Sequence, residues 1–274
     1  MRRLFWITAA AIGMCAAAGP ASASAAVVEL GATASPVLAP ACPKNVSPAN
    51  CTIILTQSTA LETVRDGIAS PTVVKQAGQI VAFTVGLSAL SSNRTTSRTD
   101  IHYLDQTYGG TTRAAVTVLR RTGAASLRRW TVIAESPMIH LQPYLGQVVQ
   151  IPLATTLPVL PGDTIALTTS TWVPVLSIDV SRTRFAYRQS RSSNCNNPAT
   201  TSQAQLRPGV STQYVCNYPG TRVEYSATEV TSPVALDPIH VAFRPAAGVR
   251  SSTLRAAHVP DARPAPSGGA AVAR

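Results

Sequence analysis

Residues 100–105 hold the densest group of side chains that could do chemistry, two carboxylates and an imidazole in the sequence Asp-Ile-His-Tyr-Leu-Asp. Such groups bind metal ions and exchange protons. On a strand, Asp100 and His102 would share one face and Asp105 would point away, because side chains alternate. Three metal ligands would therefore need a bend. The polar residues 93–98 favour the alternative, a solvated loop that enters a strand.

Other catalytic patterns are missing from the sequence. It has no Gly-x-Ser-x-Gly motif, and its four histidines (His102, His140, His240 and His258) lack the local context of a catalytic triad. The twelve acidic residues are scattered, so nothing selects a pair for glycoside hydrolysis. We expect no catalytic residue, no cofactor and no metal site, and we expect His140 to be a hydrogen-bonded structural residue.

The cysteines predict disulfides. Cys15 lies in the N-terminal segment, and the other four are Cys42, Cys51, Cys195 and Cys216. An even number in an exported chain predicts two disulfides, for which three pairings exist. Local pairing, Cys42 with Cys51 and Cys195 with Cys216, is the one we expect. A metal site is the rival interpretation, but no Cys-x-x-Cys spacing or nearby histidine supports it.

Aromatic and basic residues suggest binding, because sugar rings stack on flat aromatic faces. The available aromatic rings are Trp130, Tyr144, Trp172, Tyr214 and Tyr218. Arg182, Arg184 and Arg188 have even spacing and would form a basic stripe on one strand face. The candidate binding residues are Trp172, Tyr144, Arg184 and Arg188. The alternatives are that Trp172 packs in the core and that the arginines are ordinary solvated surface.

The first 25 residues predict export. Two arginines precede an apolar stretch that ends near residue 18, and small residues at positions 23 and 25 form a cleavage site. We expect the mature chain to begin at Ala26, or at Ser24 after an earlier Ala-Ser-Ala site. Acylation of Cys15 would instead anchor the chain, but the residue before it is Met rather than a small residue. The expected location is extracellular, in association with the cell envelope.

The rest of the chain carries the period-two pattern of β-strands and no amphipathic helix of any length. The expected strands are residues 27–30 (an edge strand), 51–57, 79–87, 113–121, 127–135, 147–154, 164–169, 182–189, 211–217 and 221–228. Turn signals separate them, such as Pro161-Gly162. These features predict an all-β fold, a single antiparallel β-sandwich of jelly-roll type.

Composition divides the chain into four parts. A signal peptide spans residues 1–25, an extended lead-in spans 26–41, and the sandwich domain spans 42–245. The Ala, Pro, Gly, Ser and Arg composition of residues 246–274 predicts a disordered tail. Two uncharged or nearly uncharged stretches, 76–93 and 151–178, are diluted by Thr, Ser and Gln, and prolines interrupt the second. They predict buried strands, so we expect no transmembrane segment in the mature chain.

Several short motifs resemble a known family. They are Ser-Pro-Met-Ile-His-Leu-Gln-Pro-Tyr-Leu-Gly at 136–146, Leu-Pro-Gly-Asp-Thr-Ile-Ala-Leu at 160–167, Thr-Trp-Val-Pro at 171–174, Cys195 in an Asn-rich loop, Gln-Tyr-Val-Cys at 213–216 and Glu-Tyr-Ser-Ala at 224–227. Over residues 75–230 the chain resembles a family of uncharacterised exported actinobacterial β-sandwich proteins. The resemblance implies a β-sandwich and export. The family has no established activity, so it implies no catalytic residue.

The charge balance bears on partners. With 23 basic and 12 acidic residues the formal net charge is +11, which favours anionic partners such as cell-envelope polymers, or simply keeps the protein soluble. No dense basic run with interleaved aromatic residues indicates nucleic acid. The leading hypothesis is a non-catalytic module that binds a glycan, an anionic or neutral polysaccharide, or a cell-envelope polymer. The alternatives are a structural envelope or matrix component with protein partners only and, less favoured, a hydrolase.

Overall fold

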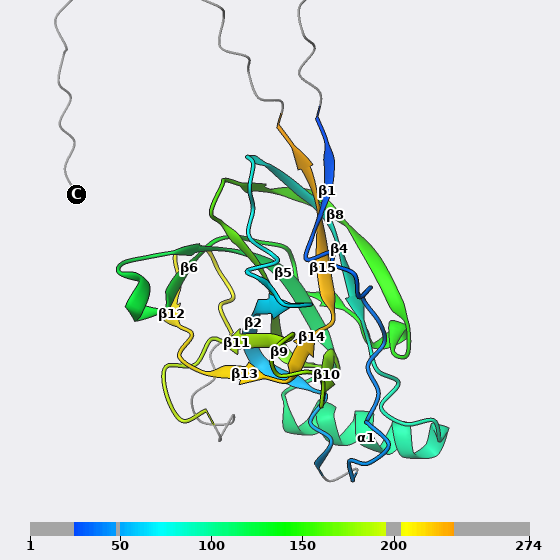
Figure 1. Ribbon diagram of the computed structural model, residues 1–274. Coiled ribbons are helices and arrows are strands. Elements are labelled where there is room, and N and C mark those ends of the chain that lie inside the picture. The colour runs from blue at the N-terminus through cyan, green and yellow to red at the C-terminus, as the bar shows by residue number, and fades with distance from the viewer. Residues whose placement is uncertain (1–24, 48–49, 196–203, 233–274) are drawn as a thin grey trace, which may run out of the picture. The chain divides into compact units, whose positions relative to one another are not determined.

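The strands of the chain assemble into antiparallel sheets. The computed structural model describes residues 25–47, 50–195 and 204–232, and all of them lie within one compact unit, Met1–Ala235 (Figure 1). The predicted all-β fold is confirmed, because the sheets pack face to face as an antiparallel sandwich with a single α-helix among the described residues. The predicted signal peptide and the predicted tail, 246–274, lie outside the described residues.

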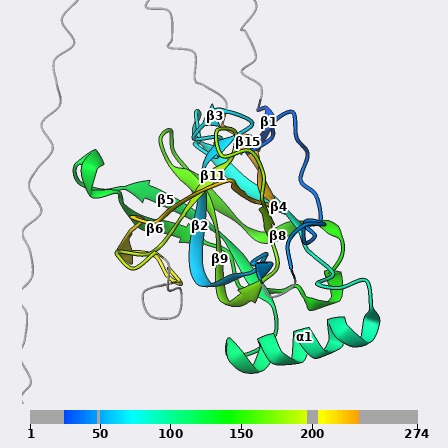
Figure 2. The ribbon, with the colours of Figure 1, turned by 60° about the horizontal axis from the view of Figure 1, so that its bottom comes forward.

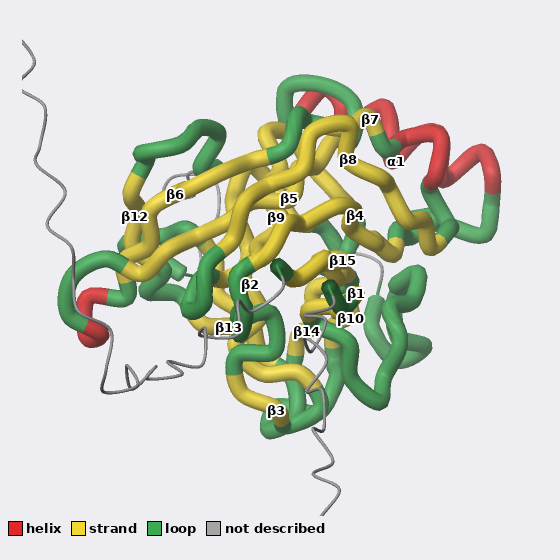
Figure 3. Tube along the Cα trace, turned by 90° about the horizontal axis from the view of Figure 1, so that it is seen from above, coloured by secondary structure: helices red, strands yellow, loops and turns green. Residues whose placement is uncertain are grey.

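One face of the sandwich is a four-stranded sheet, visible beside the larger sheet in Figure 3. In spatial order its strands are β1 (Val27–Leu30), β15 (Tyr225–Thr231), β4 (Gly78–Gly86) and β8 (Val148–Val159). The prediction of an edge strand at Val27–Leu30 is confirmed, since β1 pairs with β15 only.

The other face is a nine-stranded sheet. Along its main path the strands are β12 (Ser211–Gln213), β6 (Arg129–Glu135), β5 (Arg113–Arg121), β9 (Thr164–Val173), β2 (Leu55–Arg65), β11 (Ala186–Gln189) and β13 (Asn217–Pro219). Two short strands lie off this path, β3 (Ile68–Ala69) against β2 and β7 (Ile139–His140) against β5. A separate pair, β10 (Leu176–Ile178) and β14 (Thr221–Val223), lies beside them.

The main core fills the space between the sheets. Its fully buried side chains include Phe83 and Val85 of β4, Val116 of β5 and Leu167 of β9. On β4 the predicted alternation holds from Phe83 to Leu87. A β-bulge between Ile80 and Ala82 then reverses it, so Ile80 enters the core and Val81 is only half-buried.

The large sheet curls, and its two edge strands are neighbours in the sequence. The predicted strand 211–217 is in fact two strands, β12 at one edge and β13 at the other, and only residues 214–216 join them. Four Cα steps span at most about 15 Å. The edges must therefore approach each other, and Figure 1 shows the chain passing directly from β12 to β13. A second apolar cluster lies inside this curl, with Trp130 packed edge-to-face on Tyr214 at 5.1 Å between ring centroids.

The prediction that the chain has no helix is wrong. Residues Arg94–Thr107 form helix α1, which lies across one end of the sandwich (Figures 1 and 2). Asn93 caps it, since its side-chain oxygen accepts hydrogen bonds from the backbone N–H groups of Thr95 (2.9 Å) and Thr96 (3.1 Å). Only Leu104 of this helix is buried. The sequence therefore lacks the apolar stripe by which a surface helix is normally recognised.

The lead-in of residues 26–41 packs on the sandwich through buried charges. Arg222, which is ion-paired with Glu224 at 3.2 Å, donates hydrogen bonds to the carbonyls of Ser35 (3.1 Å) and Pro36 (2.8 Å). A Cβ atom at Gly86 would lie 1.9 Å from the Leu38 carbonyl oxygen, so only glycine lets the lead-in cross β4 there.

Both disulfides have the expected pairing, Cys42 with Cys51 and Cys195 with Cys216. They indicate an oxidising environment. No helix among the described residues is long and apolar enough to cross a membrane.

Candidate binding pocket

A cavity of about 500 Å³ opens at the end of the sandwich near the C-terminus of α1. We call it the aromatic pocket. Its lining residues are Cys51, Thr52, Ile54, Thr56, Tyr108, Leu176, Ile178, Tyr187, Gln189, Arg191, Cys195, Tyr218 and Thr221. They come from segments far apart in the sequence, and one cysteine of each disulfide is among them. The volume is in the range of pockets that hold small molecules.

Two stacked tyrosines form one wall of the aromatic pocket. Tyr187 on β11 pairs directly with Tyr218 on β13, and their rings stack with centroids 5.0 Å apart and planes inclined by 24°. Tyr187 is 3% exposed, whereas Tyr218 is half-buried. Tyr218 is therefore the more exposed ring of the pair, with Tyr187 stacked on it and the Arg191 guanidinium 5.9 Å from its centroid.

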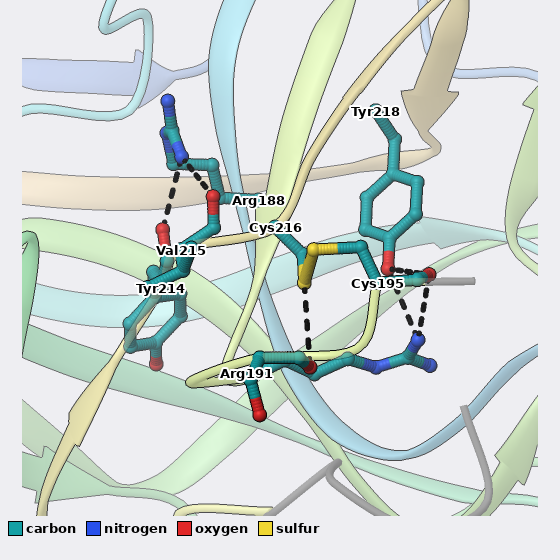
Figure 4. The surroundings of a disulfide bond; sticks show 8 residues. Arg188, Arg191, Cys195, Tyr214, Val215, Cys216 and Tyr218 are labelled. Carbon is teal, nitrogen blue, oxygen red and sulfur yellow. Dashed lines mark hydrogen bonds between the residues drawn. A yellow bond between two sulfur atoms is a disulfide. The ribbon is translucent and has the colours of Figure 1, made fainter. Parts of the chain in front are cut away.

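The Cys195–Cys216 disulfide and Arg191 hold the Tyr218 hydroxyl in place (Figure 4). Tyr218 donates a hydrogen bond to the Cys195 carbonyl (3.0 Å) and accepts one from Arg191 Nη1 (3.0 Å). Burial raises the pKa of the Tyr218 phenol, and the positive charge of Arg191 only partly opposes this. The hydroxyl therefore stays neutral and remains a donor at physiological pH.

Gln189 adds an amide to the same wall. Its Nε2 donates to the Tyr187 hydroxyl at 2.8 Å, which fixes the side chain. Its Oε1 finds no hydrogen-bond donor among the described residues, although the residue is only 5% exposed. An unpaired buried acceptor is costly, so this oxygen favours a hydroxyl or amide donor that enters the pocket.

Helix α1 brings Tyr108 to the opposite side. Tyr108 is the C-cap residue, and its N–H donates to the Leu104 carbonyl at 2.9 Å. The end of the helix is fixed by Trp172, whose Nε1 donates to Asp105 Oδ1 (2.9 Å) and to the Gly110 carbonyl (3.1 Å). Tyr108 is half-buried, so part of its ring faces the cavity.

The described lining of the aromatic pocket combines aromatic rings with hydrogen-bonding groups. Its lining contains tyrosine rings, threonines, an amide and a guanidinium, but no carboxylate or histidine. Among the residues that the structure describes, no group of three or more His, Cys, Asp or Glu side chains could hold a metal ion.

The four binding residues expected from the sequence do not line this pocket. Trp172 is completely buried, which corrects its expected role, because a ring without free surface cannot stack on a ligand. Tyr144 is 39% exposed and belongs to the 3-10 helix Gln142–Tyr144. Arg184 is ion-paired with Asp66 at 2.6 Å, and Arg188 lies on the other face of β11 from Tyr187.

The expected basic stripe is also corrected. β11 begins only at Ala186, so Arg182 and Arg184 lie in the preceding turn and not on the strand face of Arg188. The Asp66 carboxylate, which pairs with Arg184, also accepts hydrogen bonds from Thr33 and Ser35. A hydrogen bond from Thr33, others from Ser35, and Arg184 itself lower the pKa of Asp66 to about 2.

Asp100, His102 and Asp105 also lie in a different secondary structure from the one expected. These residues lie on α1 rather than on a strand, so Asp100 and His102 do not share a face. Asp105 holds the Trp172 indole, and His102 is exposed. His140, expected to be a hydrogen-bonded structural residue, is an exposed residue of β7.

Sequence reasoning missed Tyr108, Tyr187, Gln189 and Arg191, and named Tyr218 only as one of several available rings. A signal was present, because Tyr187 and Gln189 stand two residues apart and therefore share one strand face. The contribution of Tyr108 depends on a helix that the sequence pattern did not indicate.

Comparison of the chain with protein-family models, with curated proteins and with solved structures finds no match. The resemblance to exported actinobacterial proteins therefore stays a prediction.

Proposed function

We propose that this chain is an exported, non-catalytic binding module whose aromatic pocket takes a sugar unit of a glycan or cell-envelope polymer. The observation that carries the proposal is the half-buried Tyr218 ring, supported by Tyr187 and surrounded by hydrogen-bonding groups of Gln189 and Arg191. A sugar ring has an apolar face that stacks on an aromatic ring and hydroxyl groups at its edge that bond to amide and guanidinium groups.

Export is part of the same proposal. Two disulfides fit an oxidising compartment, and the sequence of residues 1–25 has the features of a cleavable signal. Membership of the exported actinobacterial family belongs to the proposal as well. A secreted module with a small aromatic pocket suits attachment to a polymer outside the cell.

The alternative, a structural component with protein partners only, would use an exposed sheet edge. The long edge strand β8 is the obvious candidate, with Val148 46% exposed. However, Pro152 and Pro158 both lie in β8, and proline has no N–H to donate to an added strand. The aromatic pocket therefore supports a binding role better than this edge supports assembly.

The test is retention of the purified exported protein on insoluble peptidoglycan, chitin and cellulose. We expect at least one polymer to retain the wild type, and we expect Tyr218→Ala and Tyr108→Ala each to abolish retention. The two residues stand on opposite sides of the pocket, and Tyr108 takes no part in the Arg191 network. Tyr144→Ala is the matched control, because it removes an exposed tyrosine outside the pocket.

Folding of each variant is checked by its melting temperature. A wild type that none of the polymers retains, or retention that survives both pocket substitutions, would overturn the proposal. Release of soluble sugar from a retained polymer would contradict the non-catalytic part of it.

A further inference from the structure

A second cavity lies on the other face of β11. It measures about 410 Å³, and its wall includes Arg121, Arg128, Arg188, Trp130, Thr63 and Thr164. We call it the basic cleft. Because side chains alternate along a strand, Arg188 faces this cleft while Tyr187 and Gln189 face the aromatic pocket.

The three arginines come from different parts of the curled sheet. Arg121 ends β5, and Arg128 stands just before β6 in the loop that joins the two strands. Arg128 has a left-handed backbone with φ of 47°, directly after the 3-10 helix Ala125–Leu127. Its backbone carbonyl accepts a hydrogen bond from the Tyr214 N–H at 2.8 Å, so the loop is tied to the segment that Arg188 also holds.

Each of two guanidinium groups is held in place on one side only. Arg188 Nη1 donates to the carbonyls of Tyr214 (3.0 Å) and Val215 (2.8 Å), as Figure 4 shows. Its Nε and Nη2 groups have no acceptor among the described residues, and together they form the fork that binds two oxygens of one anion. The Arg121 guanidinium lies over the Trp130 ring, 4.9 Å from the centroid, which orients it without using its hydrogen bonds.

The charge of the basic cleft is not neutralised within the described part of the protein. None of Arg121, Arg128 and Arg188 is within ion-pair distance of a described carboxylate. Glu62 is the only acidic residue of the wall, but its side chain has no exposed surface and is ion-paired with Arg65. All three arginines line the same cavity wall. Burial lowers the pKa of Arg188, and the positive charges of Arg128 and Arg121 lower it further.

We propose that the basic cleft binds a phosphate-type oxyanion, with two of its oxygens on the Nε and Nη2 groups of Arg188 and the others facing Arg121 and Arg128. A tetrahedral anion offers oxygens in several directions, so it can accept from three guanidinium groups at once, which a single carboxylate does less well. The site is separate from the aromatic pocket, since β11 lies between them. The proposal of a phosphate site does not depend on whether the aromatic pocket binds sugar.

The first experiment is calorimetric titration of the exported protein with inorganic phosphate at low ionic strength. The cleft variant is Arg121→Gln with Arg128→Gln, and the charge-matched control is Arg94→Gln with Arg98→Gln on the exposed face of α1. We expect the affinity of the cleft variant for phosphate to fall at least about tenfold, because it loses two charge-assisted contacts. The control variant should bind like the wild type.

Arg188→Lys is the second variant, because it keeps the charge but loses the fork. We expect it also to bind phosphate at least about tenfold more weakly, with folding verified by the melting temperature. Tyr108→Ala should leave phosphate binding unchanged, which separates this site from the aromatic pocket. A wild type that does not bind phosphate, or a cleft variant that binds as tightly as the wild type, would overturn the proposal.

The source of the phosphate is found by two further measurements with the same variants. One is retention on immobilised poly(glycerol phosphate), and the other is cosedimentation with vesicles that contain phosphatidylglycerol. Loss of polymer retention in the cleft variant identifies a polymer phosphate, and loss of cosedimentation identifies a lipid headgroup. Binding of inorganic phosphate alone identifies the free anion. In each of these cases the cleft is a phosphate site.

Discussion

On one side of β11, Tyr187 and Gln189 face a pocket walled by tyrosine rings, whereas Arg188 on the other side faces a cleft walled by guanidinium groups. The polar groups of the aromatic pocket largely satisfy one another, as in the hydrogen bonds that join Arg191, Tyr218 and the Cys195 carbonyl. In the basic cleft, like charges stand together, and the described residues supply no counter-charge.

The difference shows how one strand can serve two kinds of recognition. Alternation places the two chemistries a single residue apart. The residues that surround each face then determine how it responds to a ligand. The disulfide and the stacked rings make the aromatic pocket rigid before any ligand arrives. The basic cleft instead has charge repulsion that a bound anion would relieve, so its ligand should stabilise the fold more strongly.

The largest expected effect concerns Trp172, which supports only the aromatic side. Trp172→Ala should destabilise the protein by about 3–5 kcal/mol in a urea titration, because it empties a fully buried site in β9. Trp172→Phe fills most of the volume but loses the hydrogen bonds to Asp105 and Gly110 that hold the end of α1. We expect this variant to lose polymer retention and to keep phosphate binding.

Equal loss of both kinds of binding in a folded Trp172→Phe protein would break the comparison. It would mean that the two sites depend on the same support.

Removal of the Cys195–Cys216 disulfide by a double alanine substitution comes next. We expect a loss of about 2–4 kcal/mol in the free energy of unfolding, and loss of the aromatic pocket with it. The matched control removes Cys42–Cys51, which closes a loop of sequence separation 9 rather than 21. By loop entropy alone its cost should be smaller by about 0.7 kcal/mol. Urea titrations of both variants check the order, and a costlier loss of Cys42–Cys51 would contradict it.

Acidity should change the stability of the fold while leaving the aromatic pocket unaltered, because no carboxylate or imidazole lines that pocket. Burial raises the pKa of Glu135 to about 7, from its usual 4.5. The folded protein therefore holds this proton more tightly than the unfolded chain does. The stability that protonated Glu135 contributes is complete below pH 4.5 and is lost as the pH rises through 7. Burial raises the pKa of Glu62 as well, which acts in the same direction. We expect Glu135→Gln to flatten the fall in melting temperature between pH 5 and 8.

Binding of a neutral glycan should stay constant over the same pH interval, because arginines remain protonated and tyrosines remain neutral. A melting temperature that rises with pH between pH 5 and 8 would contradict the predicted loss of stability.

The smallest expected effect is that of salt. Added sodium chloride should weaken phosphate binding by several-fold, because it screens the exposed guanidinium groups, and should leave polymer retention through the aromatic pocket unchanged. Phosphate at the same ionic strength as chloride should raise the melting temperature slightly. Identical responses of the two sites to salt would contradict the claim that charge governs binding in the basic cleft alone.

Much of the fold could be predicted because burial on one face imposes a period of two. The range of β5 matches the expected strand residue for residue, and both disulfides pair as expected from local spacing. Helix α1 could not be recognised in this way, since it buries Leu104 alone and is rich in threonine. Asn93 was its one local signal, because asparagine is among the best helix N-caps.

The candidate site was harder to predict because it is assembled by distant segments. The strand expected at 211–217 contains Tyr214, whose ring points into the curl while the backbone crosses from one sheet edge to the other. Nothing in local alternation reports such a crossing. Trp172 illustrates the opposite difficulty: a large aromatic residue beside turn-forming neighbours looks accessible in sequence, and only the packing of α1 against β9 shows that it is enclosed.

The three residues that join β12 to β13 have a kinetic consequence. β12 docks on β6 and β13 docks on β11, at opposite ends of the strand order, so the segment between them can close only after β6, β5, β9, β2 and β11 have assembled. We expect this connection to close late on the folding pathway. Cys216 belongs to that connection, and its partner Cys195 follows β11. Oxidation of this cysteine pair should therefore occur only in nearly native molecules. The appearance of the Cys195–Cys216 bond during refolding would then time the final step of folding, whereas Cys42–Cys51, nine residues apart, can form in a largely unstructured chain.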